Sequence, residues 1–186
     1  RTVDPRTKTI RYSNVEHGLV YGIEFETRKR LAQLWRVLKY FELGGNISLI
    51  YSKVEITSEE YELIKKFDPT AGNTRPLYGQ SPYIVNIELG YHHPAIGTSA
   101  SVYYNVAGSR LSEVTLGASP DIFEQPFHQL DFSLKQKIWR SLSLHFAVKN
   151  ILASRLKKSQ EFKGKEYLYQ QYQMGQKYSL SLSYSL

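Results

Sequence analysis

The last segment of the chain shows a strict alternation of apolar and polar positions. From Tyr178 to Leu186 every even position is leucine or tyrosine and every odd position is serine. Successive side chains of a β-strand point to opposite faces, so this segment predicts a strand with one apolar and one small polar face. A single such strand also fits a soluble β-sandwich. The interpretation therefore depends on whether the pattern recurs and with what spacing.

The same alternation recurs six times earlier in the chain, which predicts seven strands. The opposite positions in these segments carry mainly Gly, Ser, Asn and charged residues, and Ile50 interrupts the alternation once. The period of two residues favours half-buried strands over helices. The predicted strands cover residues 19–30, 41–52, 83–91, 100–107, 130–135, 142–149 and 178–186.

The connections between the predicted strands alternate between short and long. The short ones cover 31–40, 92–97 and the region of Lys137 and Ile138, and the long ones cover 53–80, 108–126 and about 152–169. Outer-membrane barrels have short periplasmic turns and longer extracellular loops, whereas a sandwich has less reason to sort its loops by length. We therefore expect an all-β, antiparallel up-and-down transmembrane β-barrel, of which this chain supplies about 7–8 strands of a larger barrel. All long connections should then lie at one end of the sheet.

Two connections contain helical signals. Thr57 and Glu60 have the spacing of a capping box, and the following residues can continue as a short helix that ends at Asp68-Pro69. Between the first two strands, Leu31, Leu34, Trp35 and Leu38 have helical spacing. Trp35 is either an anchor at the membrane–water interface or a buried loop aromatic.

Composition narrows the class of protein. The mean hydropathy is −0.41, and no apolar run approaches the ~18 residues of a membrane helix. Fifteen tyrosines against one methionine suit rings placed where lipid meets water. The chain has no cysteine, so disulfides and thiolate sites are excluded. Its net charge of +7 is scattered apart from Arg28-Lys29-Arg30, and we expect no nucleic-acid partner.

The polar rows contain the candidate site residues. A carboxylate that faces lipid is costly, so these rows should line a water-filled interior. The lumen-facing candidates are Glu24, Glu26, Asn46, Asn86, Glu88, Asp131 and His145.

None of the reactive side chains forms a convincing catalytic or metal-binding pattern. Ser143 and His145 share a strand face, but no third orienting residue or oxyanion donor accompanies them. His92 and His93 are adjacent on a strand and should point to opposite faces. We therefore expect no enzyme activity, no catalytic residue, no cofactor and no metal. Asp121 and Glu124 are expected to hold loop structure, with a ligand contact as the alternative.

Four segments resemble the C-terminal barrel portion of the TonB-dependent outer-membrane receptors. The likeness extends from about Asn14 to the end of the chain, and the order of the segments makes it more specific than any one of them. The segments are 22–29, 45–52, 79–86, and 120–126 joined to 130–132 and 148–152.

The tail adds a fifth point of resemblance. Gln173, Gly175, Tyr178 and Leu180 are similar to the signal that the barrel-assembly machinery reads, although such strands usually end in Phe and this one ends in Leu. The lipid-facing or assembly candidates are Gly175, Tyr178, Leu180, Leu182, Tyr184 and Leu186.

The resemblance implies a barrel of about 22 strands around a plug, located in the bacterial outer membrane and driven by TonB. Residues 1–186 would be the C-terminal part of that barrel, without the plug, and the chain starts at Arg1 without a signal peptide, as a piece of a longer protein would. The implied partners are outer-membrane lipid, the remaining strands and plug, TonB through the plug, and the barrel-assembly machinery.

The implied function is active uptake of a siderophore, cofactor, glycan or peptide. Two alternatives remain: an outer-membrane barrel that serves as a structural or secretion-complex component without cargo, and a soluble all-β binding module.

Overall fold

The main element of the protein is an antiparallel sheet of seven long strands in chain order. The computed structural model describes residues 2–4, 9–11, 17–115 and 119–185. Across the sheet the order is β14-β11-β10-β7-β6-β4-β3, and the short β5 (Thr74–Arg75) pairs with β4. The long strands are β3 (Gly18–Arg30), β4 (Phe41–Glu55), β6 (Tyr83–His93), β7 (Thr98–Ala107), β10 (Gln129–Lys137), β11 (Leu142–Lys149) and β14 (Lys177–Tyr184).

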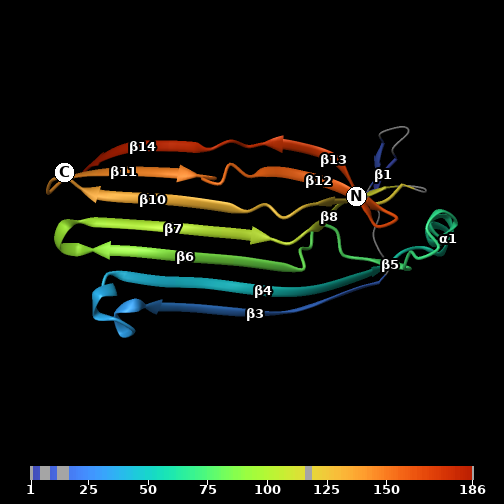
Figure 1. The fold of residues 1–186 in the computed structure, drawn as a ribbon, viewed down its shortest axis with the longest axis horizontal. Coiled ribbons are helices and arrows are strands. Elements are labelled where there is room, and N and C mark those ends of the chain that lie inside the picture. The colour runs from blue at the N-terminus through green and yellow to red at the C-terminus, as the bar shows by residue number, and fades with distance from the viewer. Residues whose placement is uncertain (1, 5–8, 12–16, 116–118, 186) are drawn as a thin grey trace.

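The connections are sorted by length between the two ends of this sheet. The three short turns lie at one end, where the C-terminus also lies, and the three long connections lie at the other (Figure 1). The expectation drawn from loop lengths is therefore confirmed. Within the described residues the sheet stays open: β3 and β14 each pair on one side only and form its two borders (Figure 1).

The strand register places the apolar rows together on one face. Ile23 lies opposite Leu49, Leu43 opposite Leu89, and Phe132 opposite both Val102 and Val148. Over most of the sheet nothing covers these rows among the described residues, and Phe25 and Leu180 are 62% and 69% exposed. Ile50, which breaks the alternation, lies opposite Gly22 on the polar face, where the missing side chain leaves room for it.

The long connections contain strands that the alternation did not predict. They build β8 (Arg110–Thr115), β9 (Ile122–Glu124), β12 (Arg155–Phe162) and β13 (Lys165–Gln173). With β1 (Thr2–Val3) and β2 (Ile10–Arg11) they form a second sheet, β13-β12-β9-β8-β1-β2, which we call the outer sheet. Its strands β12 and β13 continue the direction of β11 and β14 beyond the main sheet (Figure 1). Leu111 and Ile122, each 1% exposed, form its small core.

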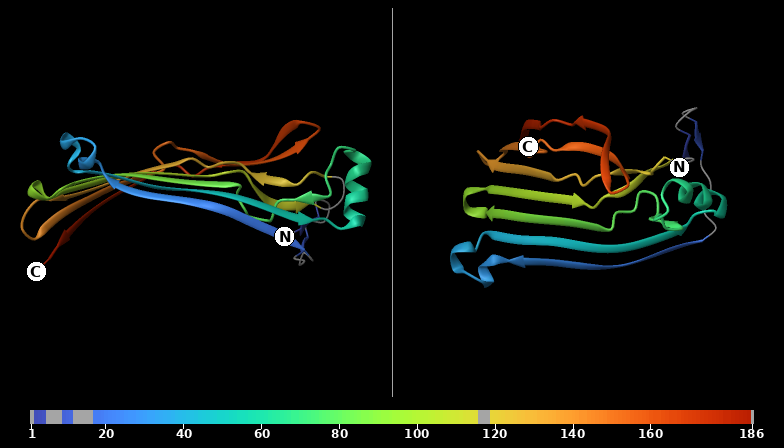
Figure 2. Two further views of the ribbon diagram at one scale, coloured as in Figure 1. Left: turned by 90° about the horizontal axis from the view of Figure 1, so that it is seen from below. Right: turned by 45° about the vertical axis from the view of Figure 1, so that its right-hand side comes forward.

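Short helices complete the two ends of the molecule. The helix α1 (Ser58–Phe67) lies at the outer end of the protein (Figure 2). At the other end, η1 (Leu31–Gln33) and η2 (Arg36–Leu38) flank Trp35, and η3 (Pro94–Ile96) forms the next turn. Trp35 is 64% exposed, so the buried alternative for it is wrong. None of the helices in the described part of the chain has the length and apolarity to cross a membrane.

One of the two hydrogen bonds of the predicted capping box is present at the start of α1. Thr57 Oγ1 accepts from the Glu60 backbone N–H at 3.3 Å, while the Glu60 carboxylate turns away to Arg75. We expect Thr57→Ala to destabilise α1 by about 1 kcal/mol, since one N-terminal N–H loses its acceptor. Hydrogen exchange of the α1 amides measures the change. Ser58→Ala, which removes a hydroxyl one residue later without removing the cap, should leave exchange unaltered; equal effects would contradict the assignment.

Candidate functional site

The predicted polar candidates share one face of the main sheet. Glu26 lies opposite Asn46, Asn46 opposite Asn86, and Asn86 opposite Asn105. Glu88 lies opposite Tyr103, which in turn lies opposite Asp131. His145 lies opposite Lys135 and Ser181, on the same face by strand alternation. The structure thus brings all seven candidates onto one wall, which we call the polar face; that it lines a lumen stays a prediction.

A row of hydrogen-bonded side chains, three asparagine amides and one glutamate carboxylate, crosses four strands of the polar face. Asn46 Nδ2 donates to Glu24 Oε1 at 2.8 Å, and Asn86 Nδ2 donates to Asn46 Oδ1 at 2.8 Å. Asn105 Nδ2 donates to Asn86 Oδ1 at 2.5 Å. Each amide keeps a second N–H and a lone pair, so this amide row presents alternating donors and acceptors to a ligand. A shallow hollow of about 220 Å³ lies over it.

The central member of the amide row bonds to both neighbours. We expect Asn86→Ala to lower the free energy of unfolding by about 1 kcal/mol, because two side-chain hydrogen bonds are lost at a partly solvated position. Urea unfolding of the refolded protein in detergent measures it. Ser48→Ala, on the same face and outside the row, should stay near the wild-type midpoint. A wild-type midpoint for Asn86→Ala would show that water replaces the row without cost.

A charged cluster lies nearer the short turns. Arg28 Nη1 donates to Glu42 at 2.9 Å and Nη2 donates to Glu88 at 3.3 Å, while Arg30 lies 3.9 Å from Glu42. The Arg28 side chain is 61% exposed, so these pairs contribute little stability and mainly fix the positions of the charges. A groove of about 560 Å³ runs past Arg30, Glu42 and Glu88 to His92.

Asp131 and His145 have different surroundings. Asp131 accepts from the Asn150 backbone N–H at 2.9 Å and from Gln129 Nε2 at 2.8 Å, so its carboxylate holds the turn after β11. The ring of His145 borders a hollow of about 200 Å³ in which half of the lining residues are serines, and Ser183 Oγ lies 3.4 Å from its Nε2. No carboxylate is bonded to this ring among the described residues, so the structure shows no general base held in place by a third group.

The adjacent histidines separate as expected from strand alternation. His92 Nδ1 lies 2.8 Å from Ser99 Oγ, whereas the His93 ring lies 3.8 Å from the Tyr40 ring centre to centre. They therefore do not converge on one ion. Within the described ranges, no three His, Asp or Glu side chains are grouped as metal ligands.

The terminal strand carries its predicted apolar row on the face opposite the candidates above. Tyr178, Leu180 and Leu182 lie opposite Val148, Phe146 and Leu144, and Tyr184 lies opposite Leu142. Gly175 precedes β14 in a turn with φ +70°, which favours glycine, and is not itself in the strand. Leu186 lies outside the described residues.

Aromatic rings lie at both ends of the apolar rows. Tyr21 and Tyr51 are in contact at 5.0 Å near the long connections, and Phe41 and Tyr91 are in contact at 5.0 Å near the short turns. From Phe41 to Tyr51 the strand spans about 33 Å. At the usual tilt of ~40° this corresponds to about 25 Å across a membrane, the height of the lipid-facing band between two aromatic girdles.

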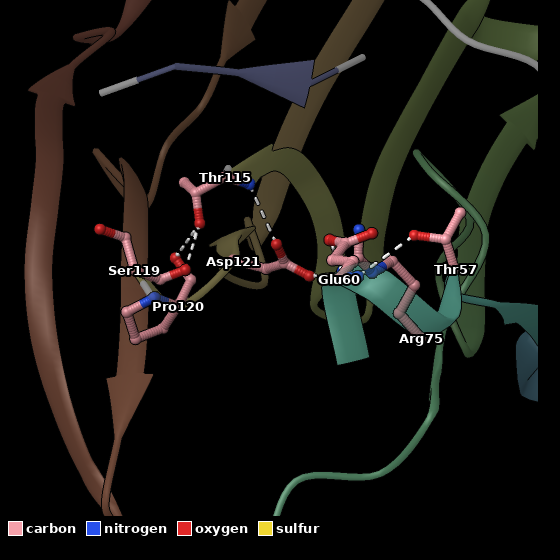
Figure 3. A network of polar contacts seen from close by, with 7 residues as sticks. All are labelled: Thr57, Glu60, Arg75, Thr115, Ser119, Pro120 and Asp121. Carbon is pink, nitrogen blue, oxygen red and sulfur yellow. Dashed lines mark hydrogen bonds and ion pairs between the residues drawn. The ribbon is translucent and has the colours of Figure 1, made fainter. Parts of the chain in front are cut away.

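An ion-pair network joins two long connections at the outer end (Figure 3). Arg75 Nη2 donates to Glu60 at 2.5 Å, and its Nε lies 3.2 Å from Asp121 Oδ2 with its N–H poorly aligned. Asp121 also accepts from the Thr115 N–H at 3.1 Å. Burial raises the pKa of the Asp121 carboxyl, although Arg75 and the Thr115 N–H act in the opposite direction. The structural role expected for Asp121 fits these contacts.

Sequence reasoning identified Asp121 and Glu60 separately but missed Arg75, the residue that joins them. Arg75 is 14% exposed, and its two partners lie 15 and 46 positions away in the chain. No periodicity connects these positions, so the sequence carries no local signal for the network.

The comparison with protein families gives one match. Residues 1–184 match the family described as "Outer membrane protein beta-barrel family". No curated protein and no solved structure matches the chain.

Proposed function

The chain belongs to the outer membrane protein beta-barrel family, and from this premise we propose that it is one arc of a wide, TonB-dependent uptake barrel. Membership places the protein in the bacterial outer membrane. The uptake function goes further than the family and rests on the shape and the two faces of the main sheet.

The open, gently curved sheet is the observation that carries the proposal. Seven strands with an apolar and a polar face end in two unpaired borders that lie far apart (Figures 1 and 2). Unpaired backbone groups cannot remain in the hydrocarbon layer, so both borders need partners. The gentle curvature favours closure with many more strands, and barrels of that width hold a plug or a channel.

The proposed partners follow from these two borders and two faces. Further strands, from a part of the protein outside this sequence or from another chain, would pair with β3 and β14. The apolar face would contact outer-membrane lipid, and the polar face would contact a plug that TonB acts on. The barrel-assembly machinery would recognise the terminal strand. The proposal contains no catalytic step.

The outer end and the polar face would then contact the ligand one after the other during uptake. Ligand would first meet the outer sheet and the connection that carries α1, which Arg75 ties to the next connection. It would next pass the amide row and the charged cluster, which offer hydrogen bonds and both signs of charge. Siderophores, cofactors, glycans and peptides all fit this chemistry.

Energy-dependent uptake tests the proposal. The source bacterium and isogenic strains that lack this gene or TonB would be grown on limiting iron, cobalamin, glycans or peptides as sole sources. We expect one nutrient to support growth only when both genes are present. Equal growth of all strains on every nutrient would contradict the uptake proposal. An envelope defect or a co-purifying complex in its place would favour the structural alternative.

A further inference from the structure

The polar face divides into two halves of opposite charge. On β3, β4 and β6 it carries four glutamates, Glu24, Glu26, Glu42 and Glu88, and two arginines. Arg28 pairs with Glu42 and Glu88, and Arg30 pairs with Glu42. The strands β10, β11 and β14 instead carry basic residues, and all of them occupy odd-numbered positions. Strand alternation and the register therefore place four lysine cations and one histidine on the polar face: Lys135, Lys137, His145, Lys149 and Lys177.

Two of these cations are placed against each other. Lys149 lies directly opposite Lys177 in the β11–β14 pair, where Cβ atoms are about 5 Å apart. Like charges at directly opposed positions destabilise a sheet. Both side chains are exposed, and across the described residues neither forms an ion pair. An arrangement that costs stability and has no internal partner favours a role for an external anion.

The one acidic residue of these three strands does not neutralise the lysines. Asp131 accepts two hydrogen bonds, from Asn150 N and Gln129 Nε2, and no lysine of the described ranges lies within ion-pairing distance of it. Lys135 and His145 lie deeper in the wall, opposite each other, at the serine-lined hollow of about 200 Å³. Ser133, Ser179 and Ser181 line the same hollow and can donate O–H groups to an oxyanion.

We propose that the wall of β10, β11 and β14 is an oxyanion path, which begins at Lys149 and Lys177 and continues to Lys135 and His145. Its ligand is a small solute that carries phosphate or carboxylate groups. Lysine ammonium groups supply charge and serine hydroxyls supply charge-assisted hydrogen bonds. This inference rests on the proposed uptake function and narrows its cargo to anionic solutes.

Equilibrium binding to the purified protein, in detergent or nanodiscs, tests the path. The probes are inorganic phosphate and citrate, which separate the two oxyanion types, and calorimetry at low ionic strength gives the affinity. We expect saturable binding of at least one probe, weakened at least tenfold in the double variant Lys149→Gln, Lys177→Gln. The matched control, Lys29→Gln, removes an exposed lysine on the opposite face of the main sheet, where it lies opposite Leu43, and should leave the affinity unchanged.

A thermal melt separates binding from folding. The double variant removes two opposed like charges, so its melting temperature should equal or exceed that of the wild type. If it melts lower, Lys135→Gln replaces it in the same comparison with the same expected loss of affinity. The inference is overturned if the wild type shows no saturable binding of either probe, or if Lys29→Gln weakens binding as much as the wall variant. Because binding needs no energy source, failure here is distinct from failure of TonB-dependent uptake.

Discussion

Replacing Arg75 with methionine is expected to release the connection between β4 and β6 from the outer sheet. The change leaves the carboxylates of Glu60 and Asp121 largely buried and without their cation. Removal of one partner from a buried pair costs about 3 kcal/mol or more. Hydrogen exchange of residues 56–82 in the detergent-solubilised protein should accelerate by more than a hundredfold, while the long strands keep their protection.

An ion pair within the outer sheet provides the control. Arg110 is 42% exposed and pairs with Glu124 at 2.6 Å. Exposed pairs contribute less than about 1 kcal/mol, so Arg110→Met should change exchange only slightly. Similar acceleration in both variants would show that burial does not set the cost.

The pH response of the network follows from Asp121. Because burial raises its folded-state pKa, this carboxyl contributes stability that is fully present below its unfolded pKa and is lost as the pH rises through the folded pKa. Asp121→Asn, which keeps an acceptor for the Thr115 N–H, should therefore be tolerated at neutral pH and flatten the pH dependence of exchange. Accelerated exchange in Asp121→Asn, similar to that in Arg75→Met, would contradict the predicted loss of stability with rising pH.

An arginine in place of Val102 is expected to prevent stable insertion. Val102 lies in the apolar row at the middle of β7, between Leu89 and Phe132. Arginine on the lipid face near the midplane costs about 2–4 kcal/mol. The fraction of heat-modifiable, folded protein in the outer membrane, and the urea midpoint after refolding into vesicles, should both fall.

The neighbouring Ser101 gives a control at the same depth on the opposite face. Ser101→Arg places the same side chain on the polar face, where water can solvate it, and should fold nearly as well as the wild type. If the two arginine variants behave alike, the assignment of the two faces is wrong.

Alternation identified the seven long strands because a membrane demands apolar side chains at every second position. The outer sheet escaped prediction for the same reason. The segments Arg155–Phe162 and Lys165–Gln173 pair as strands, yet they lie beyond the apolar band and carry polar or charged residues on both faces. Backbone pairing continues there while the side-chain pattern that reveals it stops.

The candidate site was predictable where it depends on strand alternation. Alternation predicts that Asn46, Asn86 and Asn105 lie on the polar face. The register that joins them into a row is known only from the structure. The opposed Lys149 and Lys177 could have been suspected from their odd positions, but only the β11–β14 pairing places them face to face. The role of Arg75 depends on contacts between distant connections, which a local sequence pattern cannot predict.

The order of the long strands has a consequence for how the wall is put together. Every long strand pairs with its neighbours in the chain, and even β11 and β14 are separated only by a locally paired hairpin. Three of the connections are short turns and three are long, but the entropic cost of closing a loop grows slowly with its length, so the wall can grow one hairpin at a time from either border. In the closed barrel that we propose, only the final seam, where β3 and β14 would meet further strands, would require a long-range search, and we expect that step to limit the rate of maturation.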